Sequence, residues 1–99
     1  MKLEVLDVAD CEVAKEVRYY NSKSPGLGTR FVVAVNECFE IIKEWPGVYR
    51  ALKGGYRCRG VKVFPHAVIY KVYNNVIYVV AVAPYRRRPY YWMRRKVPR

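Results

Sequence analysis

The stretch that decides the fold is AVIYKVYNNVIYVVAVA, residues 67–83. Valine, isoleucine and tyrosine fill both halves of it, and these residue types favour strands. Asn74-Asn75 stands in the middle, and asparagine tolerates the positive φ angles that a two-residue type I′ turn requires. Residues 67–73 and 76–83 are therefore predicted to form a β-hairpin.

The turn sets the register of this hairpin, because each residue before it must face one residue after it. The expected pairs are Tyr73 with Val76, Lys71 with Tyr78, and Ile69 with Val80. Side chains alternate between the two faces of a sheet, so one face carries Lys71, Tyr73 and Tyr78. The other face carries a more apolar set: Val68, Tyr70, Val72, Ile77, Val79 and Ala81. We expect helices to cover the apolar face and a partner to bind the face of Lys71.

Further strands are expected upstream of the hairpin. Residues 49–52 and 57–64 are rich in strand-forming residues and complete an antiparallel meander. The separators are Gly54-Gly55 and Pro65-His66. Residues 3–6 fit a short first strand. The face on which Arg57 and Arg59 lie stays open, because one residue more or less in the following connection reverses it.

Two helical segments lie between the first strand and the meander. Apolar residues recur every three or four positions over residues 9–20 and again over 27–45. Asp7 is expected to be the N-cap of the first helix, which should end near Tyr20. Pro46-Gly47 stops the second helix. The link between them is short, so the helices should form an antiparallel hairpin.

These elements predict an α+β fold in a single domain over residues 1–99. Its order is a short N-terminal strand, an antiparallel two-helix hairpin, and a three- to four-stranded antiparallel β-meander. A basic C-terminal tail, residues 84–99, follows the meander. Ninety-nine residues are enough for one domain with one core and leave no room for a second domain.

Charge divides the chain into two unlike halves. All eight acidic residues precede residue 45, whereas thirteen of the nineteen Lys and Arg residues lie in 50–99. The second half therefore carries +13 and the whole chain +11. Such a field attracts polyanions: nucleic acid, an anionic membrane surface or an acidic protein. A solvated basic face without a partner is the plain alternative.

Several function classes are not supported. No apolar run has the length of a signal peptide or a membrane span, so we expect a cytoplasmic protein that does not bind membranes. Cys11, Cys38 and Cys58 are far apart and lack the spacing of a zinc site, which predicts reduced structural cysteines. We therefore expect neither a metal nor a cofactor.

The tail interleaves aromatic residues with cations. Arg86, Arg87 and Arg88 precede Tyr90, Tyr91 and Trp92, and more cations follow. Such a pattern suits bases stacked on rings and phosphates held by arginine. For Trp92 we favour packing on the core instead, and for the arginine run contact with an anionic partner.

Several strings in the sequence resemble toxins of the RelE/ParE superfamily. In the helical half they are Tyr19-Tyr20, Pro25-Gly26-Leu27-Gly28-x-Arg30-Phe31 and Trp45-Pro46-Gly47-Val48-Tyr49. In the second half they are Arg59, Phe64-Pro65-His66-x-x-Ile69-Tyr70, Ile77-x-Val79-x-Ala81-Val82-Ala83 and Arg87-x-Pro89-x-Tyr91-Trp92-x-x-Arg95. The resemblance spans about residues 3–95 and is greatest to the plasmid-stabilisation subgroup.

The resemblance implies the toxin of a type II toxin–antitoxin module. A cognate acidic antitoxin would neutralise it in a hetero-oligomer. RelE-like members cleave mRNA on the ribosome as metal-independent endoribonucleases, whereas ParE-like members inhibit DNA gyrase without catalysing a reaction. A non-toxic remnant, or a basic RNA-binding module of the same fold, is the alternative.

RNA cleavage by the ribose 2′-hydroxyl needs a base, an acid and cations around the phosphate. The candidate catalytic residues are Arg59, His66, Arg87 and Tyr91. The candidate nucleic-acid or partner contacts are Arg57, Lys62, Lys71, Arg86, Arg88, Tyr90, Arg94 and Arg95. A histidine beside proline in a tight connection is more often a turn residue than a catalyst.

Two positions depart from the subgroup. His66 stands where tyrosine is usual, and Pro84 stands where histidine is usual. Proline has no titratable side chain, so an obvious acid or base at the end of the last strand is missing. This difference favours gyrase inhibition over RNA cleavage.

Overall fold

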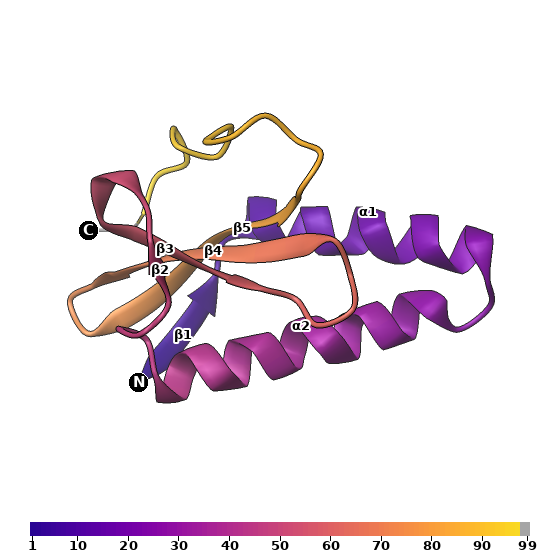
Figure 1. Ribbon diagram of the computed structural model, residues 1–99, viewed down its shortest axis with the longest axis horizontal. Helices are drawn as coiled ribbons and strands as arrows, with labels where there is room; N and C mark the ends of the chain where they lie inside the picture. The colour runs from indigo at the N-terminus through magenta and orange to yellow at the C-terminus, as the bar shows by residue number, and fades with distance from the viewer. Residues whose placement is uncertain (98–99) are drawn as a thin grey trace.

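The computed structural model of the chain describes residues 1–97, so residues 98–99 of the expected tail lie outside the described part. The elements, in chain order, are β1 (Lys2–Val5), α1 (Asp7–Lys23), α2 (Leu27–Glu44), β2 (Arg50–Ala51), a 3₁₀ turn η1 (Lys53–Gly55), β3 (Tyr56–Gly60), β4 (His66–Tyr73) and β5 (Val76–Pro84). Figure 1 shows the two helices beside the sheet and the tail passing over it. The predicted α+β class, helical hairpin and meander are confirmed.

The sheet has the order β1-β5-β4-β3-β2. The last four strands pair antiparallel in chain order, as the meander predicts. β1 adds to the outside of β5 in the parallel direction, which the sequence did not indicate. A parallel neighbour needs a long connection, and the helical hairpin with the meander supplies it.

The helix ends differ from the expected ones. Asp7 is not the N-cap: it is the first residue of α1, and Leu6 is the capping residue without a side-chain hydrogen bond. The Leu6 N–H is bonded to the Val79 carbonyl instead, so the chain passes directly from β1 into the helix. α1 also continues past Tyr20 to Lys23 before the turn.

A close contact holds the two helices together where α2 begins. The Gly28 N–H donates to the Asn21 side-chain oxygen at 2.8 Å. A Cβ atom on Gly28 would lie 2.6 Å from the Val17 carbonyl oxygen, so only glycine fits this approach. The glycine of the Pro-Gly-Leu-Gly string is therefore required for helix packing.

One core lies between the helices and the sheet. Phe31, Val35 and Ile42 of α2 pack on buried side chains of the sheet. Those side chains are Val68, Tyr70, Ile77, Val79 and Val82. The Tyr70 hydroxyl donates to the Pro46 carbonyl at 2.6 Å, which ties the end of α2 to β4. The prediction that helices cover the apolar face is confirmed for Val68, Tyr70, Ile77 and Val79 and is wrong for Val72, which is 39% exposed.

The hairpin register is correct only near the turn. Tyr73 pairs with Val76 and Lys71 with Tyr78 as expected, but a β-bulge follows between Ile69 and Tyr70. Ile69 therefore faces Ala81 and not Val80, so the third predicted pair is wrong. A bulge adds one residue to one strand and reverses the alternation beyond it. Ala81 accordingly lies in the opposite core, with Ile69 and Val80.

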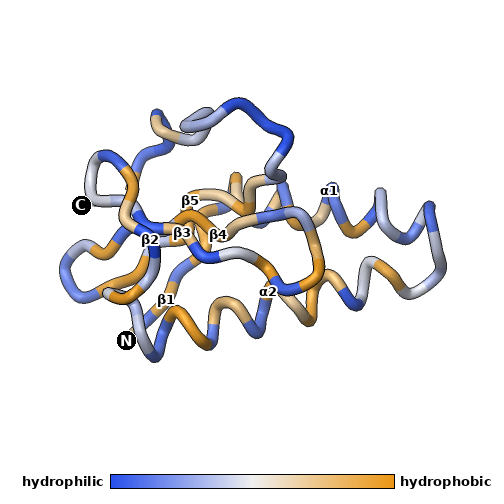
Figure 2. The backbone as a smooth tube through the Cα atoms, viewed as in Figure 1, coloured by the Kyte–Doolittle hydropathy of each residue, from blue (hydrophilic) through white to orange (hydrophobic). Residues whose placement is uncertain are grey.

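The tail covers the second face of the sheet. Trp92 is only 4% exposed and packs against Tyr56, with ring centroids 4.8 Å apart. Packing of Trp92 on the core, the favoured interpretation, is confirmed. Figure 2 shows the tail leaving β5 as a hydrophilic stretch and then returning over the sheet. The expectation that the face of Lys71 is open to a partner therefore needs correction, because part of it carries the tail.

Candidate functional site

The tail is held by a carboxylate on α1. Glu12 accepts hydrogen bonds from the Tyr91 hydroxyl at 2.5 Å and from the two terminal nitrogens of Arg95 at 2.8 and 3.1 Å. It also accepts the Val82 N–H at 3.1 Å, where the edge of β5 extends beyond β1. Arg95 in turn donates to the Val80 carbonyl at 2.9 Å. One carboxylate therefore joins α1, β5 and the tail.

Tyr91, a candidate catalytic residue, is occupied within this network. Burial raises the pKa of its hydroxyl, and the hydrogen bond to Glu12 raises the pKa further. The guanidinium of Arg87, a second catalytic candidate, lies 3.7 Å from the centroid of the Tyr91 ring. These two residues are neighbours, as the tail sequence suggests, and Arg87 is exposed.

His66, the third catalytic candidate, is completely buried, with an exposed fraction of 0%. It is the first residue of β4 and lies beside Tyr20 and Phe31. Its Nε2 is 3.6 Å from a Glu16 oxygen, and neither ring nitrogen has a hydrogen-bond partner among residues 1–97. Burial lowers the pKa of the imidazole, while Glu16 acts in the opposite direction. A substrate cannot touch this ring without a rearrangement of the core.

Arg59 belongs to the other side of the sheet. It pairs with Val68 across β3 and β4, and this register puts its side chain on the helix face. Its guanidinium lies 5.4 Å from the Tyr49 ring centroid. Arg57 shares that face, pairs with Tyr70 and donates to the Tyr49 carbonyl at 2.8 Å. Arg57 and Arg59 therefore both lie on the helix face, which the sequence had left open. The four catalytic candidates do not converge on one surface.

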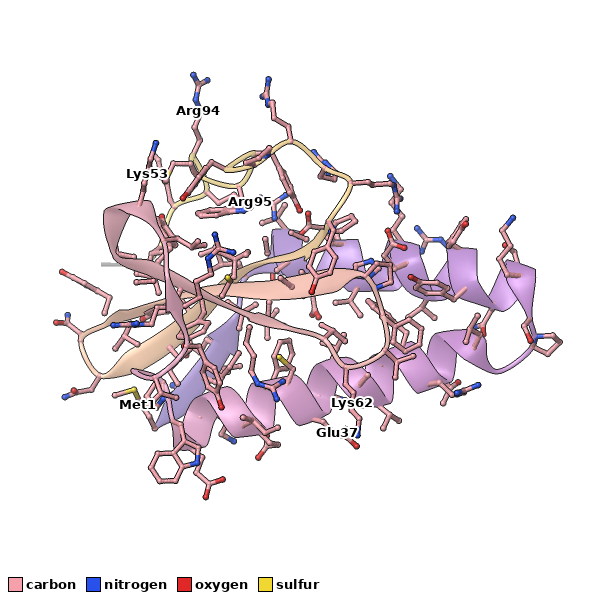
Figure 3. All side chains as sticks on the ribbon, viewed as in Figure 1. Met1, Glu37, Lys53, Lys62, Arg94 and Arg95 are labelled. Carbon is pink, nitrogen blue, oxygen red and sulfur yellow. The ribbon has the colours of Figure 1, made fainter. Side chains whose placement is uncertain are left out.

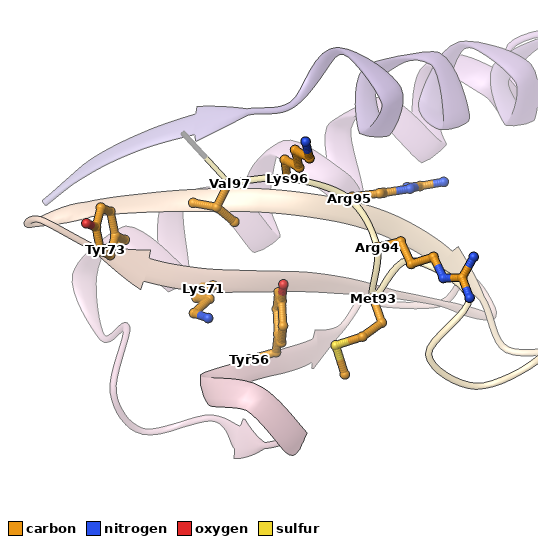
Figure 4. Close-up of a pocket in the computed structure, with 8 residues that line it drawn as sticks. All are labelled: Tyr56, Lys71, Tyr73, Met93, Arg94, Arg95, Lys96 and Val97. Atoms are coloured by element: carbon orange, nitrogen blue, oxygen red, sulfur yellow. The ribbon is translucent and has the colours of Figure 1, made fainter. Parts of the chain in front are cut away.

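A cavity of about 840 Å³ lies between the tail and the sheet. It is lined by Tyr56, Lys71, Tyr73, Met93, Arg94, Arg95, Lys96 and Val97. Figure 4 shows that the sheet supplies the tyrosines and Lys71, while the tail supplies the remaining side chains. Three of the candidate contacts, Lys71, Arg94 and Arg95, are brought together here.

The remaining candidate contacts are dispersed. Arg86 and Arg88 are exposed in the tail, and Arg86 approaches Glu16 at 3.8 Å. The Tyr90 ring lies beside Trp92 and 5.4 Å from the Lys53 ammonium. Lys62 lines a smaller groove of about 280 Å³ beside α2. Figure 3 shows Lys62 and Glu37 together at α2, and Arg94 and Lys53 projecting on the tail side.

Sequence reasoning missed Glu12, which has the most contacts in the tail network. Its i,i+4 spacing from Glu16 is the one signal available, because it puts two carboxylates on one face of α1. Lys96 and Tyr56 were also missed. Within residues 1–97 no group of His, Cys, Asp and Glu is arranged to hold a metal, and no helix is long and apolar enough to cross a membrane.

The chain thus combines a helical hairpin on a largely antiparallel sheet with a cationic tail folded over the far face. A family model described as the ParE toxin of the type II toxin–antitoxin system, parDE, matches residues 3–89, and the chain belongs to this family.

A solved structure described as a chromosomal ParDE toxin–antitoxin system from P. aeruginosa has the same fold. Its TM-score is 0.78 with 16% sequence identity, over 85% of this chain and 95% of that one. At this identity the likeness supports the fold alone. No curated protein matches the chain.

Proposed function

We propose that this toxin inhibits growth by binding DNA gyrase and that a cognate acidic antitoxin neutralises it. The observation that carries the proposal is that two candidate proton-transfer groups, His66 and Tyr91, are not free to reach a substrate. RNA cleavage needs an acid and a base within reach of the scissile phosphate. His66 is fully buried, and the Tyr91 hydroxyl is bonded to Glu12 with a raised pKa. Inhibition by binding needs neither group.

The proposal predicts that the purified toxin blocks DNA supercoiling by gyrase and leaves mRNA intact in a translating extract. His66→Phe should inhibit supercoiling as strongly as the unmodified protein, because a buried ring does not touch gyrase. Both assays should use one preparation, with the unmodified protein and the variant side by side. Normal supercoiling at saturating toxin would exclude the gyrase mechanism.

Ribosome-dependent cleavage is the second candidate. The exposed guanidinium of Arg87 stacked on Tyr91 supports it, because such a pair resembles a cation held beside a phenol for phosphate chemistry. Under that mechanism mRNA would be cut in the extract, and Arg87→Ala would stop the cutting. Arg59→Ala would leave cutting intact, because Arg59 lies on the helix face.

The antitoxin part of the proposal depends on charge. Residues 45–99 contain no acidic residue, so an acidic segment meets no repulsion from that half. Acidic segments of low hydrophobicity commonly order only when they bind. A small acidic reading frame beside this gene, whose product restores growth on co-expression, is the expected finding.

A further inference from the structure

We propose that the cavity between the tail and the sheet binds the backbone phosphates of duplex DNA. Three cations line it without a carboxylate partner among the described residues: Lys71 from β4, and Arg94 and Lys96 from the tail. The fourth lining cation, Arg95, is paired with Glu12 and so positions its neighbours. A cluster of cations without acids is the arrangement that phosphate contacts require.

Within residues 1–97 no carboxylate forms an ion pair with Lys71, Arg94 or Lys96. Glu4 is the acidic residue that shares the face of Lys71, through the register of β1 with Tyr78. It forms an ion pair of 3.0 Å with Lys2 on its own strand. The Lys71 ammonium lies 4.9 Å from the centroid of the Tyr56 ring, a cation–π contact.

Cations outside the cavity extend the same surface. Lys53 projects from the same side of the molecule as the lining residue Arg94 in Figure 3. Arg88 is exposed on the segment that leads into the tail. The surface therefore presents several separated positive charges to one side, which suits a ligand with regularly spaced phosphates.

The ligand is duplex DNA and not a single strand because only one aromatic ring of the described cavity lining is exposed. Single strands are usually held by bases stacked on successive exposed rings. Here Tyr56 is buried against Trp92 and Tyr90 packs on the same indole, so Tyr73, 39% exposed, is the one open ring. A duplex keeps its bases stacked within itself and offers its phosphates to the protein.

A peptide fits the cavity less well. One common way for an extended peptide to bind is to add a strand to a free sheet edge. The floor of this cavity is β4 and β3, whose facing residues Lys71 and Tyr56 are paired with each other. β4 also has β5 on its other side, so it presents no free edge. Recognition must therefore come from the side-chain cations.

This inference deepens the proposed function, because gyrase holds duplex DNA, but it is tested without gyrase. Fluorescence anisotropy with a short labelled duplex should show binding to the toxin alone. The logarithm of the binding constant should fall linearly with the logarithm of the salt concentration between about 50 and about 200 mM. Lys71→Gln, Arg94→Gln and Lys96→Gln should each lower the steepness of that line by about one and weaken binding.

The matched control is Lys15→Gln, which removes an exposed cation on α1 and should leave the salt slope unchanged. Urea unfolding of each variant checks that the fold is retained. The proposal is overturned if the duplex does not bind at low salt, or if Lys15→Gln reduces the slope as much as the cavity variants. Tighter binding of a single-stranded RNA of equal length would also overturn it, as would tighter binding of an acidic peptide that Lys71→Gln, Arg94→Gln and Lys96→Gln weaken. If the duplex does not bind but the toxin still inhibits supercoiling, the further inference is wrong and the proposed function stands.

Discussion

Among single residues, His66 has the least favourable environment for a polar group. Its two nitrogens and one Glu16 oxygen are buried without hydrogen bonds. An unsatisfied buried polar atom costs about 1–3 kcal/mol. The aromatic ring is well accommodated all the same, since Phe31 and His66 have centroids 4.8 Å apart. The histidine therefore fills an aromatic position of the core at an electrostatic cost.

This environment predicts a stability that depends on pH. Burial lowers the imidazole pKa in the folded protein below 6.5, its ordinary value, which the unfolded chain retains. Below about pH 6.5 the unfolded chain takes up a proton that the folded protein does not, so stability is lost as pH falls from there toward the folded pKa. Above about pH 6.5 this contribution to stability is fully present.

Urea unfolding midpoints measured across this range provide the test. Glu16, Arg86 and Glu12 also face the ring, so the informative quantity is the difference between the unmodified protein and His66→Phe. The variant should lose less stability on acidification. Equal losses in both proteins would show that carboxylates elsewhere cause the pH dependence.

At the scale of elements, the tail behaves as a third layer on the sheet. The helical hairpin covers one face through Phe31, Val35 and Ile42, and the tail covers the other through Trp92. Two kinds of interaction fasten it: the buried indole and the bonds from Tyr91 and Arg95 to Glu12. The shape of the cavity depends on this attachment.

Removal of either partner of the ion pair should loosen the tail. Both side chains are mostly buried, at 18% exposure for Arg95 and 14% for Glu12, so each truncation leaves an uncompensated charge. We expect Arg95→Ala and Glu12→Ala to lower the free energy of unfolding by about 2–4 kcal/mol. Arg94→Ala, the adjacent exposed cation, should change it by less than about 0.5 kcal/mol.

Trp92 fluorescence during urea unfolding follows this effect, because docking of the tail buries the indole. Both Glu12 and Arg95 variants should unfold at lower urea than the unmodified protein. Similar midpoints for Arg95→Ala and Arg94→Ala would mean that the ion pair does not hold the tail.

For the molecule as a whole, charge is divided along the chain. Residues 1–49, which form β1 and both helices, contain all eight acids, and residues 50–99 carry +13. A partner of negative charge is therefore steered to the sheet and tail side, and the attraction weakens as salt screens it.

The proposed antitoxin complex should show this dependence. We expect the affinity for the acidic partner to fall as salt rises, and Arg86→Gln together with Arg88→Gln to weaken it further at low salt. Isothermal titration at several salt concentrations measures both effects. The matched control is the double variant Lys15→Gln with Arg18→Gln, which removes two cations from α1 and should have little influence on the affinity. Affinity independent of salt would contradict an electrostatic attachment.

The sequence alone determined the order and type of the elements, the turn at Asn74-Asn75, and the burial of Trp92. These properties depend on local preferences and on the period of apolar residues, which neighbouring positions record. The strings shared with RelE/ParE toxins also indicated the family, which the match over residues 3–89 confirms.

Only the tertiary structure decided the bulge at Ile69, the parallel pairing of β1, the burial of His66 and the contacts of Glu12. Each depends on residues distant in the chain: Glu12 meets Arg95 across 83 positions. A side chain on a helix carries no local sign of the strand edge or tail that it will face. The physical reason is that long-range packing, and not local preference, selects which polar groups are buried and which cations stay free for a partner.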